Sequence, residues 1–167
     1  MGQAATVGLD VVGMDLVTNQ SAATASYGTK HTKPFVFVDG SVTVGGTAAK
    51  LRTITTDFTN AMNVERRFLG QATTSEPLEN DRRECIITAE SEFESLTHYA
   101  AFIAGSEVAV VQTFTDGTHS AVITMTCRYD EANPSQSGRD IIAQPLTLKA
   151  IDMADIEVVI TNADATC

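Results

Sequence analysis

The 167-residue sequence predicts a mainly β fold, an antiparallel β-sandwich or open barrel with one flanking α-helix at about residues 95–104. Two long segments alternate apolar and polar side chains, which is the period-2 pattern of half-buried strands. Glycine-containing turn signals separate further short apolar runs. The composition agrees, because the chain contains 23 threonines and no tryptophan, and threonine is favoured on the polar faces of strands.

Three regions are expected along the chain. Residues 1–33 should form an N-terminal strand, within residues 4–17, followed by an arm or linker, because residues 18–33 are small and polar. Residues 34–162 should form the β-sandwich domain, and residues 163–167 a C-terminal tail.

The domain is expected to begin with two short strands. Residues 35–38 are apolar, Asp39 and Gly40 form a turn signal, and residues 41–44 resume an apolar pattern. Gly45 and Gly46 then indicate a second turn.

Residues 51–62 and 84–94 predict the two long strands. In the first, Ile54, Phe58 and Met62 share an apolar face. In the second, Cys85 and Ile87 belong to the apolar face. The opposite, polar face is rich in threonine and acidic residues: Thr53, Thr55, Asp57, Thr59, Thr88, Glu90, Glu92 and Glu94.

The connection between these strands, residues 63–83, is long and densely charged. Its charged residues are Glu65, Arg66, Arg67, Glu76, Glu79, Asp81, Arg82 and Arg83. Compact domains rarely contain a connection of ~20 residues unless it is functional or disordered. Charges of both signs favour a loop that meets complementary charges on another surface.

The remaining elements follow from shorter patterns. Residues 95–104 have the i, i+3, i+4, i+7 spacing of a helix, with Ser95 as N-cap and Gly105 after its end. Asp116 and Gly117 indicate a hairpin turn. Further strands are expected at residues 107–114, 120–129, 146–150 and 156–160, with a loop at 130–140.

No pattern of residues indicates catalysis, a metal or a cofactor. His31, His98 and His119 lie in different elements without ligand spacing, and the three cysteines form no close pair. The formal charge of −10 argues against a basic nucleic-acid-binding surface. No apolar stretch is long enough to span a membrane. We therefore expect a non-enzymatic protein without cofactors.

The two long strands suggest assembly. Natural sheets shield or pair long edges, and a closed ring of subunits removes such edges altogether. In such a ring the polar face would line a lumen, and the charged connection would project toward the next ring.

From residue 34 onward the chain resembles the major tail tube proteins of long-tailed (siphovirus-type) bacteriophages. The resemblance rests on the order of several short segments, which are residues 34–44, Asp57-Phe58 with Asn60, residues 66–70, Pro77, Arg83-Glu84, and Phe93 before the helix. It implies a structural virion protein that forms stacked hexameric rings, with the polar face above as candidate lumen face and residues 63–83 as candidate ring-stacking loop. Longer family members have additional sequence before this region, so residues 1–33 also fit the end of a preceding segment.

The resemblance also implies partners and location. The chain would assemble with itself and with the tape measure, tail terminator and tail tip proteins, in a virion tail made in the host bacterial cytoplasm. DNA would pass through the tube without specific binding. The alternative is another phage or surface β-module, such as a tail terminator, a capsid decoration protein or an adhesin-like binding domain.

Overall fold

The computed structural model describes residues 4–9, 34–71, 74–135 and 141–161. Most of the expected arm at 1–33 and the expected tail at 163–167 lie outside the described residues. The strands are β1 Gly40–Val44, β2 Thr47–Ala48, β3 Leu51–Thr59, β4 Met62–Asn63, β5 Leu78–Glu79, β6 Glu84–Glu92, β7 Glu107–Thr115, β8 Ser120–Glu131, β9 Ala143–Ala150 and β10 Glu157–Thr161. The helices are α1 Thr97–Ala104 and two 3-10 turns, η1 Phe37–Asp39 and η2 Met153–Asp155.

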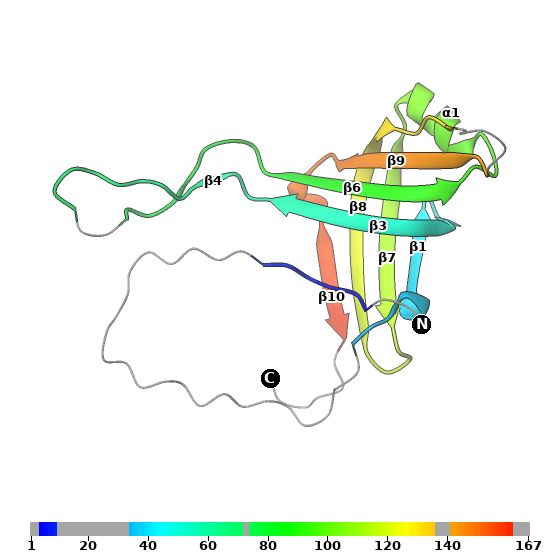
Figure 1. Ribbon diagram of the computed structural model, residues 1–167, viewed down its shortest axis with the longest axis horizontal. Helices are drawn as coiled ribbons and strands as arrows, with labels where there is room; N and C mark the ends of the chain where they lie inside the picture. Colours follow the sequence, from blue (N-terminus) through cyan, green and yellow to red (C-terminus); the bar gives the residue numbers. More distant parts are fainter. Residues whose placement is uncertain (1–3, 10–33, 72–73, 136–140, 162–167) are drawn as a thin grey trace.

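All strand pairs between these elements are antiparallel, and one eight-stranded sheet contains most of them. Its order is β2-β1-β7-β8-β9-β6-β3, with β10 also paired to β8. The long strand β8 pairs with β10 through its first half and with β9 through its second half. The sheet therefore folds over itself, and β3, β6 and β9 cross the direction of β1, β7, β8 and β10 (Figure 1). The predicted mainly β fold with one helix is confirmed.

The core lies between the two crossing layers. Along β6 every second residue is buried, from Cys85 through Ile87 and Ala89 to Ser91. Met125, Cys127 and Tyr129 of β8 and Leu146 and Leu148 of β9 complete most of the core. This alternation confirms the period-2 pattern on which the fold prediction depends.

Helix α1 covers one end of the sandwich and begins at Thr97, two residues later than predicted. Ser95 is not its N-cap; the Ser95 hydroxyl instead bonds to Thr97 Oγ1 at 2.9 Å and accepts from the Thr97 N–H at 3.4 Å. Gly105 ends the helix in a left-handed conformation, φ 61°, as predicted.

The predicted strand at 35–38 is wrong, because this segment turns into η1. The carboxylate of Asp39 accepts a hydrogen bond from the Val36 N–H at 2.9 Å, and this bond closes the turn. The predicted N-terminal strand is also not seen in residues 4–9, where Ala4 makes only an isolated bridge to Val36. The predicted turn at Gly45 and Gly46 is confirmed, with φ values of 59° and 78°.

Candidate functional site

The predicted polar face is formed by two directly paired strands. β3 pairs with β6 so that Thr55 lies opposite Thr88 and Thr53 opposite Glu90. Because residues that face each other in a ladder point to the same side of a sheet, the two polar patterns merge into one surface. The structure brings these residues together on that surface: Thr53, Thr55, Asp57, Thr59, Thr88, Glu90 and Glu92. Glu94 lies beyond the end of β6, in the connection to α1.

Strand β9 extends this surface, which sequence reasoning did not assign. β9 pairs with β6 on the side away from β3, with Thr147 opposite Thr88 and Lys149 opposite Ile86. Thr55, Thr88 and Thr147 therefore form a row across three strands. We call the outward side of β3, β6 and β9 the polar face.

The acidic residues of the polar face are largely paired with cations. Arg52 bonds to Glu92 at 2.7 Å and lies 4.0 Å from Glu90. Lys50 bonds to Glu94 at 2.6 Å, and this hydrogen bond raises the pKa of the Lys50 ammonium group. Ion pairs as exposed as these contribute little to stability. Their cations nevertheless offset the negative charge of the carboxylates on this surface.

Lys149 likewise pairs with Glu84 across β9 and β6. The region thus holds five carboxylates (Asp57, Glu84, Glu90, Glu92, Glu94) and three cations (Lys50, Arg52, Lys149). The polar face, which the sequence shows to be rich in acidic residues, is therefore mixed in charge with a small negative excess. Arg52 escaped prediction because a bulge between Leu51 and Thr53 breaks the alternation. The two cations at the start of the first long strand, Lys50 and Arg52, were the available signal in the sequence.

The predicted charged loop is a projecting hairpin. β3 ends at Thr59, earlier than predicted, and Ala61 then takes a left-handed conformation, φ 49°. β4 and β5 form a short ladder with Met62 opposite Glu79, and the Asn80 N–H bonds to the Ala61 carbonyl at 2.9 Å. Figure 1 shows this hairpin extending well away from both layers. The connection is thus a hairpin with a two-residue ladder near its base, and its described residues between Asn63 and Leu78 form no further strand.

Interactions along its length support the hairpin. Arg66 donates to the Glu76 carbonyl at 2.5 Å, and its guanidinium lies 5.6 Å from the centroid of the Phe68 ring. Arg83 pairs with Glu79 at 3.2 Å. At the base, Arg82 donates to the carbonyl of Ile151 at 3.0 Å and ties the hairpin to the domain.

The structure places all the predicted loop residues on this hairpin: Glu65, Arg66, Arg67, Glu76, Glu79, Asp81, Arg82 and Arg83. All except the half-buried Arg66 are exposed. Sequence reasoning singled out the charges and missed the exposed apolar side chains beside them, namely Met62, Phe68, Leu69 and Leu78.

Neither a metal site nor a membrane helix stands out in the part of the chain that the structure describes. Its His, Cys, Asp and Glu residues form no group of three or more that could hold a metal ion. Its helices are too short or too polar to cross a bilayer.

Comparison with known proteins identifies the family. Residues 2–150 match the phage tail tube protein family. The chain belongs to that family. This tail tube protein is therefore a structural component of virion tails. No curated protein matches its sequence significantly.

Solved structures share its fold at low sequence identity. A chain of the sheath/tube terminator of the extracellular contractile injection system PVC is 16% identical, with a TM-score of 0.56 over 81% of this chain and 100% of that one. A chain of the native gene transfer agent virion is 12% identical, with a TM-score of 0.54 over 75% of this chain and 98% of that one. A chain of the SPP1 tail tube is 10% identical, with a TM-score of 0.53 over 77% of this chain and 80% of that one.

Proposed function

We propose that this tail tube protein closes into six-membered rings that stack into a tube, with the polar face lining the lumen. The observation that carries the proposal is the position of β3. It is a nine-residue strand at the end of the sheet, and among the described strands it pairs with β6 alone. Long open edges invite pairing with another chain, and ring closure satisfies them without open-ended aggregation.

The chemistry of the polar face suits the passage of DNA. Its threonine row is hydrated and uncharged, and its carboxylates slightly outnumber its cations. A net cationic lumen would bind phosphates and release counterions, which would retain DNA. A lumen surface of mixed charge with a negative excess gains no free energy from counterion release, so DNA passes without specific binding.

The hairpin gives each ring a contact to the next. The hairpin carries Arg66, Arg67, Arg82 and Arg83 together with four acidic residues, and mixed charges define which surfaces dock. The short ladder of β4 and β5 and the bond from Arg82 to the Ile151 carbonyl hold its base to the domain. The tape measure protein would occupy the lumen, and the tail terminator and tail tip proteins would contact the two ends of the tube. The role is structural, without catalysis.

Electron microscopy of the purified chain at high concentration tests the proposal. We expect rings with six subunits and a central channel, and tubes built from those rings. A chain that stays monomeric or trimeric at all concentrations would contradict the proposal and favour a decoration or adhesin-like module.

Charge reversal separates ring formation from stacking. The double variants Arg66→Glu with Arg67→Glu, and Arg82→Glu with Arg83→Glu, should prevent tube growth while circular dichroism stays unchanged. Arg128→Gln is the control, because Arg128 pairs with Glu107 on the sheet at 2.7 Å, away from the hairpin. Normal tubes from both double variants would show that the hairpin does not mediate stacking.

A terminator role is the second candidate, since one of the structures with this fold is a sheath/tube terminator chain. A terminator closes the end of a tube and does not polymerise. Single rings that never stack, even at high concentration, would favour this candidate over a tube subunit.

A further inference from the structure

The end of the hairpin presents apolar side chains without cover from its own domain. Leu69 is fully exposed and Phe68 is 54% exposed. Arg66 stacks near the Phe68 ring, and Arg67 next to it is exposed. A single exposed apolar residue needs no explanation, whereas two adjacent ones on a projecting arm mark a contact surface. We call residues 66–70 the hairpin tip.

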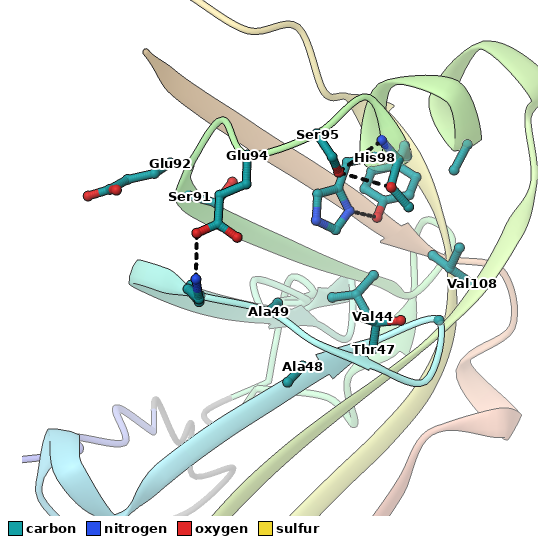
Figure 2. Close-up of a pocket in the computed structure, with 15 residues that line it drawn as sticks. Val44, Thr47, Ala48, Ala49, Ser91, Glu92, Glu94, Ser95, His98 and Val108 are labelled. Carbon is teal, nitrogen blue, oxygen red and sulfur yellow. Dashed lines mark hydrogen bonds and ion pairs between the residues drawn. The ribbon is translucent and has the colours of Figure 1, made fainter. Parts of the chain in front are cut away.

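A cavity of about 200 Å³ lies at one end of the sandwich, among β1, β2, α1, β8 and the end of β6 (Figure 2). Small and apolar side chains line much of it, including Val44, Ala48, Ala49, Ala101 and Val108. A cavity of roughly 150 Å³ holds a benzene-sized group when its walls are apolar. Here polar side chains share the lining with the apolar ones, so the space suits one leucine or phenylalanine side chain placed against the apolar side.

One side of the cavity is polar and partly closed to water. His98 Nδ1 lies 2.7 Å from the hydroxyl of Tyr129. Burial lowers the pKa of His98 and raises that of Tyr129 to about 12, so both groups are neutral at pH 7. The wall therefore carries no unpaired charge that would oppose an apolar side chain.

The opening of the cavity carries carboxylates. Figure 2 shows Glu94 with its ion pair, which joins it to Lys50 at 2.6 Å, and shows the carboxylate of Glu92 turned away from the other labelled residues. Glu94 pairs with Lys50 and Glu92 pairs with Arg52, in each case through the Oε1 oxygen of the carboxylate. A carboxylate accepts through two oxygens, so each can also meet a cation from another chain.

The hairpin tip and the cavity lie at opposite ends of the same strand pair. Thr59 and Glu84 are paired at the hairpin end of β3 and β6, and Leu51 and Ser91 are paired at the cavity end. Nine residues of strand span about 30 Å, so the tip cannot reach the cavity of its own chain. A contact between a tip and a cavity thus joins two copies head to tail, and such a heterologous contact propagates along one direction.

We propose that the hairpin tip of one copy inserts Leu69 into this cavity of a copy in the next ring, with Phe68 packing at its rim and Arg67 meeting Glu94. The inference rests on the proposed stacking of rings and names the surface that receives the hairpin. Apolar burial provides the affinity, and the arginine–glutamate contact fixes the orientation.

Cysteine cross-linking in assembled tubes tests the contact directly. In a Cys167→Ser background, the double variant Leu69→Cys with Ala48→Cys places one thiol on the tip and one at the exposed rim of the cavity. Disulfides need Cα atoms within about 7 Å. Mild oxidation of tubes should therefore yield a ladder of covalent multimers on a non-reducing gel. The matched control, Leu69→Cys with Val158→Cys on β10, should remain monomeric.

The outcomes separate the two proposals. Tubes that form but give no ladder, or the same ladder as the control, overturn the inference and leave ring stacking intact. A wild-type chain that forms neither rings nor tubes contradicts the proposed function and the inference with it.

A second pair of variants tests the inference without cross-linking. Leu69→Asp should raise the critical concentration for tube growth about tenfold or more, because the buried apolar contact is lost. Leu69→Met should change it by less than about threefold, since the thioether fills a similar volume. An unchanged critical concentration for Leu69→Asp would overturn the inference.

Discussion

Gln112 on β7 donates a hydrogen bond from Nε2 to Oγ1 of Thr56 on β3, at 2.8 Å. Gln112 is 3% exposed, so this bond lies inside the sandwich and joins strands from the two crossing layers. β3 is held on one edge by β6 alone among the described strands, and the side-chain bond adds a second restraint from across the core. The position of the polar face therefore depends on a polar contact in the core.

Removing one partner of this bond should destabilise the domain. Gln112→Leu or Thr56→Val leaves the other group without its partner in a partly buried site, and we expect each to lower the free energy of unfolding by about 1–3 kcal/mol. Urea denaturation followed by circular dichroism measures the effect.

The double variant is the control for this prediction. Since apolar groups then replace both partners, Gln112→Leu with Thr56→Val should cost less than the sum of the single changes. Additive effects would show that the two side chains contribute independently.

The sequence predicted the strands whose burial alternates and failed where the backbone departs from regular geometry. Cys85 and Ile87 were placed on the apolar face, and both are buried because period 2 holds throughout β6. The bulge after Leu51 and the left-handed Ala61 leave no trace in an apolar–polar pattern. The strand predicted at residues 35–38 failed because a local hydrogen bond from the Val36 N–H to the Asp39 carboxylate outweighed β propensity.

The sequence predicted which side chains of each long strand share a face. It did not predict which other strand lies next to them. Thr55 and Thr88 were assigned to one surface from the pattern of each strand. Thr147 and Lys149 join that surface through the pairing of β6 with β9, which depends on topology rather than local pattern. The cations that pair with the glutamates, and hence the net charge of the polar face, follow from that same topology.

The two core cysteines should resist thiol reagents in the native state. Burial raises the pKa of Cys85 to about 11 and that of Cys127 to about 12, so almost no thiolate exists at pH 8. In a Cys167→Ser background, a chromogenic disulfide reagent should modify neither thiol before unfolding and both thiols in urea. Rapid labelling of the native protein would show that the core opens readily.

Stability should fall as pH decreases from 7.5 to 5 because of His98. Burial lowers the pKa of folded His98 below its ordinary value of 6.5, so the unfolded chain binds the proton more readily than the folded one. The unfolded state is then favoured as pH drops below 6.5, and the stabilisation is complete above that value. Urea midpoints across this range, together with an NMR titration of the imidazole, measure the effect.

His98→Phe serves as the matched variant for this prediction. It retains a ring in the cavity wall and cannot titrate, so the slope of stability against pH between 7.5 and 5 should become shallower. The change also removes the bond to Tyr129, which lowers stability at all pH values alike. An unaltered slope would assign the pH dependence to other groups.

With the polar face in the proposed position along the lumen, added cations should make tubes retain DNA. Thr55 and Thr88 are exposed and directly opposite each other, so Thr55→Lys with Thr88→Lys adds two neighbouring cations in each subunit. Each phosphate that these cations neutralise should contribute about −0.9 to the slope of log K against log salt. Wild-type tubes should bind no duplex DNA at moderate salt, and the lysine variant should bind it with a strong dependence on salt.

The location of the bound DNA decides whether the polar face lines the lumen. DNA enclosed when variant tubes assemble around it should resist nuclease, whereas DNA on the outer wall should be digested. Thr55→Gln with Thr88→Gln adds length without charge, and its tubes should behave like the wild type. Nuclease-sensitive DNA on the lysine variant would place this face on the outside, and tight binding by wild-type tubes would contradict the proposed passage of DNA without retention.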